Sequence, residues 1–170
     1  MSLDGYIAQP NDDLSFLSIV EREGEDYGYH AFIEGVGAIV LGRRTYDWVM
    51  RQVLEWSHAD LDTYVVTRTA RPSQGKIHFY TGDLRELLQS LKAKTGKNIF
   101  IDGGAGLVTS LLREDLIDKY ILSIIPIFVG DGVRLFHDGN PEQRLELTAT
   151  RTYESGLVQL HYRRKRTGNV

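Results

Sequence analysis

Two apolar runs of this sequence each end in a glycine-led polar cluster. Residues 38–41 lead into Gly42-Arg43-Arg44-Thr45, and residues 99–101 lead into Asp102-Gly103-Gly104-Ala105-Gly106. Each junction is typical of a buried strand that delivers the backbone to the start of a helix, where unpaired N–H groups and the positive end of the helix dipole favour an anion. Two such junctions, one of them with paired arginines, predict a ligand with more than one phosphate, such as a dinucleotide.

Strands and helices must alternate along the chain to position these clusters. The clearest helix begins at Asp83, because leucines follow at the i, i+3, i+4 and i+7 spacing of one apolar stripe, and Gly96 ends it. Short helices are also expected at 26–34, from Arg44 to 50, and after the second cluster, where leucines and Val108 form a buried face. Strands are expected at 3–8, 38–41, 62–67, 76–80 and 99–101.

The last third of the chain has a different pattern. Residues 120–129 are nearly all apolar, which predicts a strand buried on both faces in the middle of a covered sheet, with an irregularity at Pro126. Residues 145–148 and 157–162 flank a glycine turn and predict an antiparallel hairpin. The fold class is therefore α/β, a mostly parallel sheet that ends in antiparallel strands, in one domain over residues 1–170.

Composition excludes several classes of function. The 170 residues carry a formal net charge of −3, so no general attraction to nucleic acid or membranes is expected. The basic run at 163–166 is interpreted as a solvated chain end. Cysteine is absent, and the five histidines show no i, i+4 pairing, so neither disulfides nor a metal site is expected. No apolar run reaches the roughly 20 residues of a membrane span, and no signal peptide is visible, so a cytoplasmic protein is expected.

Four segments carry a resemblance to a known family. They are Ser2-Leu3-Asp4-Gly5-Tyr6-Ile7-Ala8, Gly42-Arg43-Arg44-Thr45-Tyr46, Ile101-Asp102-Gly103-Gly104-Ala105 and Pro126-Ile127-Phe128-Val129-Gly130-Asp131-Gly132. Their order and spacing resemble the dihydrofolate reductase-like superfamily, in the branch with the C-terminal reductase domain of the bifunctional riboflavin-biosynthesis deaminase/reductase and its stand-alone bacterial relatives. The resemblance covers essentially the whole chain. It implies a three-layer fold with a mostly parallel central sheet, antiparallel C-terminal strands and flanking helices.

The resemblance implies NADPH as the cofactor and assigns residues to it. Arg43 or Arg44 meets the adenosine 2′-phosphate, and Thr45 with nearby N–H groups takes the pyrophosphate. Thr67 and Arg68 match a second contact to the adenine and the 2′-phosphate. The remaining implied cofactor residues are Gly42, Gly103, Gly104, Ala105, Gly106 and, beside the nicotinamide, Ile7. In dihydrofolate reductases the equivalent Gly-Gly peptide is cis.

A catalytic acid is the least specific part of the assignment. Folate-reducing members place a carboxylate on the first helix, and Asp26 lies sixteen residues before Gly42, which is the spacing found there. A buried carboxylate at this position relays a proton to a ring nitrogen while hydride reaches carbon. Four glutamates surround Asp26, so capping and solubility are the alternative interpretation.

Two functions remain open at this point. The first is an NADPH-dependent reductase of a pteridine, pyrimidine or related heterocyclic substrate. The second is a non-catalytic dinucleotide-binding sensor or interaction protein that retains the cofactor cradle. In the family an apolar strand precedes the first quoted segment, whereas this sequence starts within that segment, so either the sequence is shortened or the protein lacks the family's first strand. Relatives form homodimers through the C-terminal strands, and the same assembly is expected here.

Overall fold

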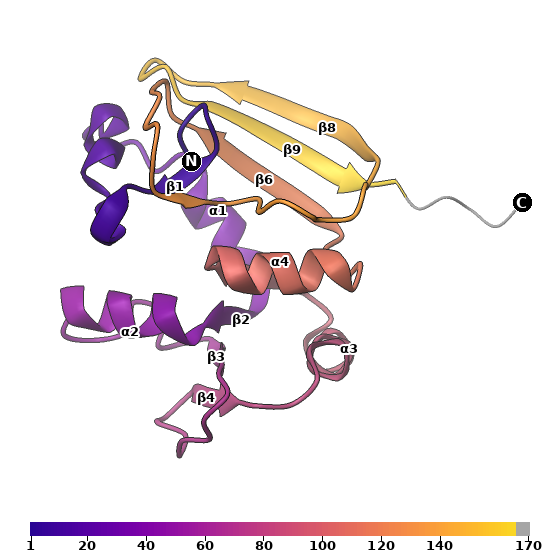
Figure 1. The fold of residues 1–170 in the computed structure, drawn as a ribbon. Coiled ribbons are helices and arrows are strands. Elements are labelled where there is room, and N and C mark those ends of the chain that lie inside the picture. The colour runs from indigo at the N-terminus through magenta and orange to yellow at the C-terminus, as the bar shows by residue number, and fades with distance from the viewer. Residues whose placement is uncertain (166–170) are drawn as a thin grey trace, which may run out of the picture. The chain divides into compact units, whose positions relative to one another are not determined.

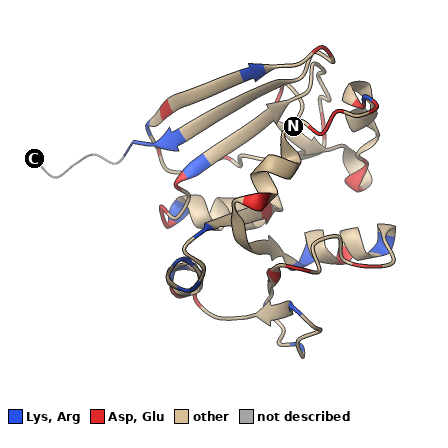
Figure 2. Cartoon of the chain, turned by 180° about the vertical axis from the view of Figure 1, so that it is seen from behind, with Lys and Arg blue, Asp and Glu red and all other residues tan. Residues whose placement is uncertain are grey.

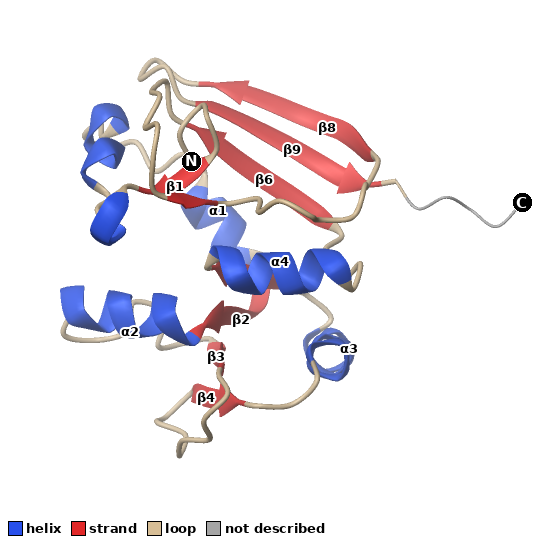
Figure 3. Cartoon of the chain, viewed as in Figure 1, coloured by secondary structure: helices blue, strands red, loops and turns tan. Residues whose placement is uncertain are grey.

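The computed structural model describes residues 1–165, and the chain divides into two compact units (Figure 1). One unit is Gly28–Glu114. The other consists of Met1–Tyr27 and the chain from Asp115 onward. Among the described residues, every α-helix lies in the unit Gly28–Glu114, whereas the other unit is built from strands and two short 3-10 helices (Figure 3).

A four-stranded parallel sheet forms the centre of the unit Gly28–Glu114. Its order is β4-β3-β2-β5. The strands are β2 (Val36–Gly42), β3 (Asp62–Val66), β4 (Ile77–Tyr80) and β5 (Asn98–Gly103). Residues 38–41 of β2 are completely buried, as expected for an inner strand of a covered parallel sheet. All four strands coincide with apolar runs predicted from the sequence.

Four helices accompany this sheet. They are α1 (Tyr29–Glu34), α2 (Arg43–Gln52), α3 (Leu84–Thr95) and α4 (Ala105–Arg113). The predicted ends of α3 are confirmed: the Asp83 carboxylate accepts a hydrogen bond from the Glu86 N–H at 2.9 Å, and Gly96 ends the helix with φ +61°. The predicted apolar stripe of α4 is buried, as are Leu87, Leu88 and Leu91 of α3, while Leu84 is half-buried. Both helices therefore pack through the faces that their sequence spacing indicates.

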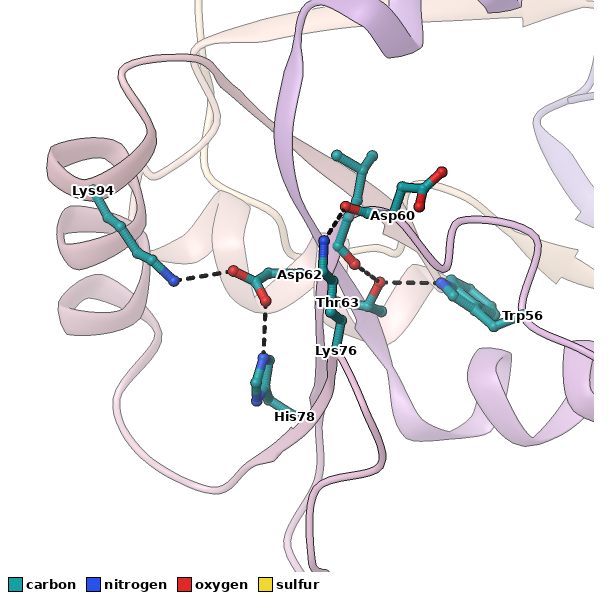
Figure 4. A network of polar contacts seen from close by, with 8 residues as sticks. Trp56, Asp60, Asp62, Thr63, Lys76, His78 and Lys94 are labelled. Atoms are coloured by element: carbon teal, nitrogen blue, oxygen red, sulfur yellow. Dashed lines mark hydrogen bonds and ion pairs between the residues drawn. The ribbon is translucent and has the colours of Figure 1, made fainter.

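A network of polar contacts holds the first residues of β3 in place (Figure 4). Trp56 is buried and donates its indole N–H to Thr63 Oγ1 at 3.0 Å, which satisfies the donor inside the core. Asp62 accepts from Lys94 of α3 at 3.0 Å and contacts His78 of β4 at 3.1 Å. The Lys94 hydrogen bond, followed by that of His78, lowers the pKa of Asp62. One carboxylate therefore links β3, β4 and α3.

The second unit contains a three-stranded antiparallel sheet of order β6-β9-β8. Its strands are β6 (Lys119–Ile124), β8 (Leu145–Thr152) and β9 (Val158–Arg164). The predicted C-terminal hairpin is confirmed by the β8–β9 pairing. A separate two-stranded pair joins β1 (Tyr6–Ala8) to β7 (Val133–Arg134), and the 3-10 helices η1 (Pro10–Asp12) and η2 (Ser15–Val20) follow β1.

Two of the segments quoted for the family resemblance meet in this unit. The Asp4 carboxylate accepts hydrogen bonds from Ser2 Oγ at 2.6 Å and from the N–H groups of Val129 and Gly130 at 3.1 and 2.8 Å. The Ser2 hydrogen bond, with these backbone donors, lowers the pKa of Asp4 to about 2. A Cβ at Gly132 would lie 2.1 Å from the Ala8 carbonyl oxygen, so this position requires glycine.

The fold class is confirmed, because parallel strands alternate with helices and antiparallel strands follow. The prediction of one inner strand over 120–129 is wrong. β6 ends at Ile124 and is an edge strand of its three-stranded sheet, and Ile121 is 43% exposed. Pro126 lies just beyond the strand end, because proline cannot continue the ladder. No helix in residues 1–165 is long and apolar enough to cross a membrane.

The interpretation of residues 163–166 as a solvated end is wrong at Arg164. This side chain is only 6% exposed, forms ion pairs with Asp115 and Asp118, and donates to the Asp115 carbonyl. A buried guanidinium is tolerated because these acceptors compensate much of its lost hydration. Arg166 lies outside the described residues.

Candidate functional site

The first glycine cluster forms the junction between β2 and α2. Gly42 ends the strand and is the N-cap of the helix, in an extended conformation with φ −76° and ψ 149°. Arg43, Arg44 and Thr45 form the first turn of α2, as the sequence predicts. Basic residues lie at both ends of this helix (Figure 2). Arginines in a first turn oppose the helix dipole, so the arrangement favours a bound anion that both the dipole and the arginines attract.

The second cluster forms the equivalent junction between β5 and α4. Gly104 is the N-cap, and its carbonyl oxygen accepts from the N–H groups of Leu107 and Val108 at 3.0 and 3.2 Å. The Gly103–Gly104 peptide is cis, as the family resemblance implies. Ala105 and Gly106 are the first two residues of the helix, where N–H groups have no acceptor within the helix. These groups can therefore bind an anion.

The two clusters lie side by side because β2 and β5 are parallel neighbours. Leu41 is in register with Gly103. A Cβ added to Gly104 would lie 2.8 Å from Thr45 Oγ1, and a Cβ on Gly42 would lie 3.7 Å from the Gly103 oxygen and the Gly104 nitrogen. Gly103 has φ +92°, which L side chains rarely adopt. Two helix N-termini thus meet at the carboxyl edge of the sheet, where ligands bind in open α/β sheets.

Thr67 and Arg68 continue the same edge directly after β3. The Thr67 N–H donates to the Tyr80 carbonyl at 2.9 Å, so the parallel pairing extends one residue beyond the strand. The Thr67 hydroxyl donates to the Thr69 carbonyl at 3.3 Å and accepts from the Thr69 N–H at 3.2 Å. Thr67 therefore shapes the turn, and Arg68, which is exposed, is the residue of the two that has a charge to offer a ligand.

Asp102 is an ionisable group of the second glycine cluster, and no sequence pattern indicates a role for it. It lies at the end of β5, immediately before the glycine pair. Burial raises its pKa from an ordinary value of 3.8 to about 6. Burial, followed by the nearby charge of Asp102, raises the pKa of the Tyr29 hydroxyl. A carboxyl group with a pKa near 6 can hold or release a proton close to neutral pH, which is the property of a general acid or base.

Two further residues were missed in the sequence, Asp47 and Arg71. Asp47 lies one turn after Arg43 in α2, and Arg71 follows β3 in the loop that contains Arg68. Their side chains form an ion pair at 3.5 Å. The i, i+4 spacing of Arg43 and Asp47 was a readable signal for the local pair. The contact to Arg71 depends on the tertiary fold and leaves no pattern in the sequence.

Ile7 and Asp26 belong to the other unit. Ile7 is the middle residue of β1, which pairs with β7. The helix predicted at 26–34 begins only at Tyr29, so Asp26 is not on a helix. Tyr27 and Gly28 have φ +55° and +77°, and two successive left-handed residues prevent a right-handed helix from including Asp26. The side chain of Asp26 is partly buried in the turn before α1.

Comparisons with known proteins agree on one family. Residues 1–159 match the model of the RibD C-terminal domain. The uncharacterized protein YwjB of Bacillus subtilis (strain 168) is 37% identical over 163 residues, which cover 95% of this chain and 92% of YwjB.

Solved structures extend this similarity. A crystal structure from Shewanella sp. PV-4, of a candidate riboflavin biosynthesis protein, is 33% identical with a TM-score of 0.87, covering 98% of this chain and 96% of that one. A diaminohydroxyphosphoribosylaminopyrimidine deaminase/5-amino-6-(5-phosphoribosylamino)uracil reductase from Thermotoga maritima shares the fold with a TM-score of 0.71 and 14% identity. The match covers 96% of this chain and 54% of that protein.

Proposed function

This chain belongs to the RibD C-terminal domain family, and from this premise we propose that it is a cytoplasmic NADPH-dependent reductase of a pteridine, pyrimidine or related heterocyclic substrate. The observation that carries the proposal is the junction of two helix N-termini at one edge of the parallel sheet. Because glycines at this edge have no side chain, a ligand can approach the backbone N–H groups closely, and arginines lie beside them. This donor set fits a dinucleotide with an additional phosphate.

We call the junction of residues 42–45 with residues 103–106, together with Arg68, the cradle. Its residues are suited to different parts of the cofactor. The N–H groups of Ala105 and Gly106, with Thr45, are suited to the pyrophosphate, because the glycines let the backbone approach closely. Arg43, Arg44 and Arg68 are suited to the 2′-phosphate, since guanidinium groups bind phosphate oxygens through two parallel N–H donors. The cofactor, when bound, supplies the hydride. Ile7 is the family match to the apolar wall beside the nicotinamide.

Reduction of a ring also needs a proton, and we assign it to Asp102. With a pKa of about 6, this carboxyl group is partly protonated near neutral pH, and it adjoins the glycine pair of the cradle. Asp26, the family-based candidate, lies before α1 and not on a helix. The raised pKa of Asp102 and its place beside the glycine pair support Asp102 as a proton donor.

The experiment that tests this function follows NADPH absorbance at 340 nm in the presence of a panel of ring substrates. The panel includes 5-amino-6-(5-phosphoribosylamino)uracil, dihydropterins, folates and pyrimidines. We expect NADPH oxidation that depends on at least one of these compounds. Tight binding of NADPH without turnover of any compound would favour the sensor function instead, and the absence of NADPH binding would contradict both functions.

We also propose that the protein is a homodimer joined through β8. This strand ends its sheet, and all eight of its residues are exposed, including Leu145 (39%) and Leu147 (53%). An unpaired edge strand with exposed leucines favours association, and a two-fold axis covers both copies with one self-complementary surface. Charged side chains can protect an edge strand from pairing. Arg163 of β9, however, forms an ion pair with Glu146 of β8 at 2.9 Å, which offsets its charge beside this edge.

Sedimentation equilibrium at micromolar concentration measures this assembly. We expect a species of about twice the 19.3 kDa of the chain. Replacing Leu145 and Leu147 together by lysine is expected to give the monomer, because two charges at the edge oppose pairing. A wild-type mass of one chain across the whole concentration range would contradict the dimer.

A further inference from the structure

One carboxylate in α2 holds two arginines from different segments. Asp47 Oδ2 lies 3.1 Å from Nε of Arg43, one turn earlier in the same helix. Its other oxygen, Oδ1, lies 3.5 Å from Nη1 of Arg71, which comes from the loop after β3. Asp47 therefore joins the first turn of α2 to the loop that also carries Arg68.

Arg71 has a second anchor on the sheet. Its guanidinium carbon lies 5.4 Å from the centre of the Phe79 ring on β4, within the range of a cation–π contact. The Phe79 ring in turn packs edge-on against the ring of buried Tyr46, with 5.6 Å between the two ring centres. The loop arginine is thus fixed between Asp47 and an aromatic cluster of the core.

These ion pairs are too exposed to serve mainly as stabilising contacts. The side chains of Arg43, Asp47 and Arg71 are 46%, 31% and 38% exposed. Ion pairs with such exposure contribute little to folding, whereas they do restrict the rotamers of long side chains. Arg43 uses Nε toward Asp47, so its terminal N–H groups are available for an acceptor in front of the helix. Two guanidinium groups against one carboxylate also leave a net positive charge for an anion.

We propose that Asp47 is the positioning residue of the 2′-phosphate subsite, and that Arg71 is a further specificity-determining residue there. The inference rests on the proposed function, because it assumes that the cradle binds a nucleotide with a 2′-phosphate. Asp47 orders Arg43 and Arg71 before the ligand arrives. Less side-chain freedom is then lost on binding, which favours the phosphorylated nucleotide over its unphosphorylated counterpart.

The test compares adenosine 2′,5′-bisphosphate with 5′-AMP by isothermal titration calorimetry on the full chain. Asp47→Asn and Arg71→Gln should each weaken adenosine 2′,5′-bisphosphate by about three- to tenfold and change 5′-AMP by less than about twofold. Asp47→Glu should recover part of the loss, since glutamate can also pair with an arginine four residues away. Glu114→Gln is the matched control: it weakens an exposed ion pair with Arg85 in the same unit and should change neither affinity.

The outcomes separate this inference from the proposed function. Asp47→Asn that binds adenosine 2′,5′-bisphosphate as tightly as the wild type, or more tightly, would overturn the positioning role, because the carboxylate would then only screen the arginines. Equal losses for both nucleotides would overturn it as well. If the selective loss is observed but no substrate is reduced, the inference stands and the reductase function fails. A wild-type protein that binds neither nucleotide would overturn both.

Discussion

Asp102→Asn is expected to lower the turnover of NADPH by about 10²–10⁴-fold, the usual contribution of a general acid. Asparagine has nearly the same shape but has no acidic proton to transfer, so cofactor affinity should change little. Asp26→Asn is the direct comparison, because Asp26 is the alternative proton donor. A turnover that survives Asp102→Asn and is lost in Asp26→Asn would reverse the assignment.

Asp102→Asn should lower the turnover but raise the stability of the folded protein. Burial raises the pKa of Asp102 to about 6, so the ionised carboxylate destabilises the folded state above that pH. Each pKa unit corresponds to about 1.4 kcal/mol, and Asp102→Asn should therefore stabilise the protein by about 1–3 kcal/mol at pH 7. The folded-state pKa lies above the unfolded one, so this gain should disappear as the pH falls from 6 to about 4. Urea unfolding of the wild type and of Asp102→Asn, at pH 7 and at about pH 4, measures this difference in the free energy of unfolding.

The pH dependence of catalysis follows from the same group. A general acid must be protonated in the free enzyme, so kcat/KM should fall as the pH rises through about 6. The falling limb should be absent from whatever activity remains in Asp102→Asn. A wild-type profile that instead rises through pH 6 would identify a base and contradict the role of Asp102.

Arg43→Ala and Arg44→Ala are each expected to weaken NADPH by about 1.5–3 kcal/mol, which is the range of a charge-assisted hydrogen bond. NADH lacks the 2′-phosphate and should lose much less. The difference measures the contact to that phosphate, because both cofactors share every other group.

Arg51→Ala provides the control for this pair. Arg51 lies in the last turn of the same helix, so its removal changes the charge of α2 without touching the cradle. We expect both cofactors to bind this variant as they bind the wild type. Equal losses for NADPH and NADH in Arg43→Ala and Arg44→Ala would refute the 2′-phosphate assignment.

Local sequence signals were sufficient for the parts of the fold that depend on local chemistry. The helix limits at Asp83 and Gly96 are fixed by a side-chain cap and a left-handed glycine, and the junction at Gly103 by a backbone conformation that few residues adopt. The junction at Gly42 shows in the sequence as an apolar run followed by a polar cluster. The pairing of β2 with β5 then brings the two predicted clusters together.

The misassigned elements depend on tertiary surroundings. The apolar run at 120–129 resembles an inner strand, yet β6 pairs within its sheet with β9 alone and keeps Ile121 exposed. Arg164 sits in a basic run but is buried by acceptors from 115–118. The acidity of Asp102 is set by burial, which no sequence window reports. The left-handed conformation of Tyr27 also gave no signal, and it removes Asp26 from the expected helix.

The most direct test of the account is a fluorescence titration of the wild-type protein with NADPH and with NADH at one salt concentration. We expect saturable binding of both cofactors, with NADPH tighter by at least about tenfold, since the 2′-phosphate adds charge-assisted contacts to arginine. Equal affinities would contradict the 2′-phosphate subsite. If neither cofactor binds, the junction of Gly42 and Gly104 is not a dinucleotide cradle, and the central claim is wrong.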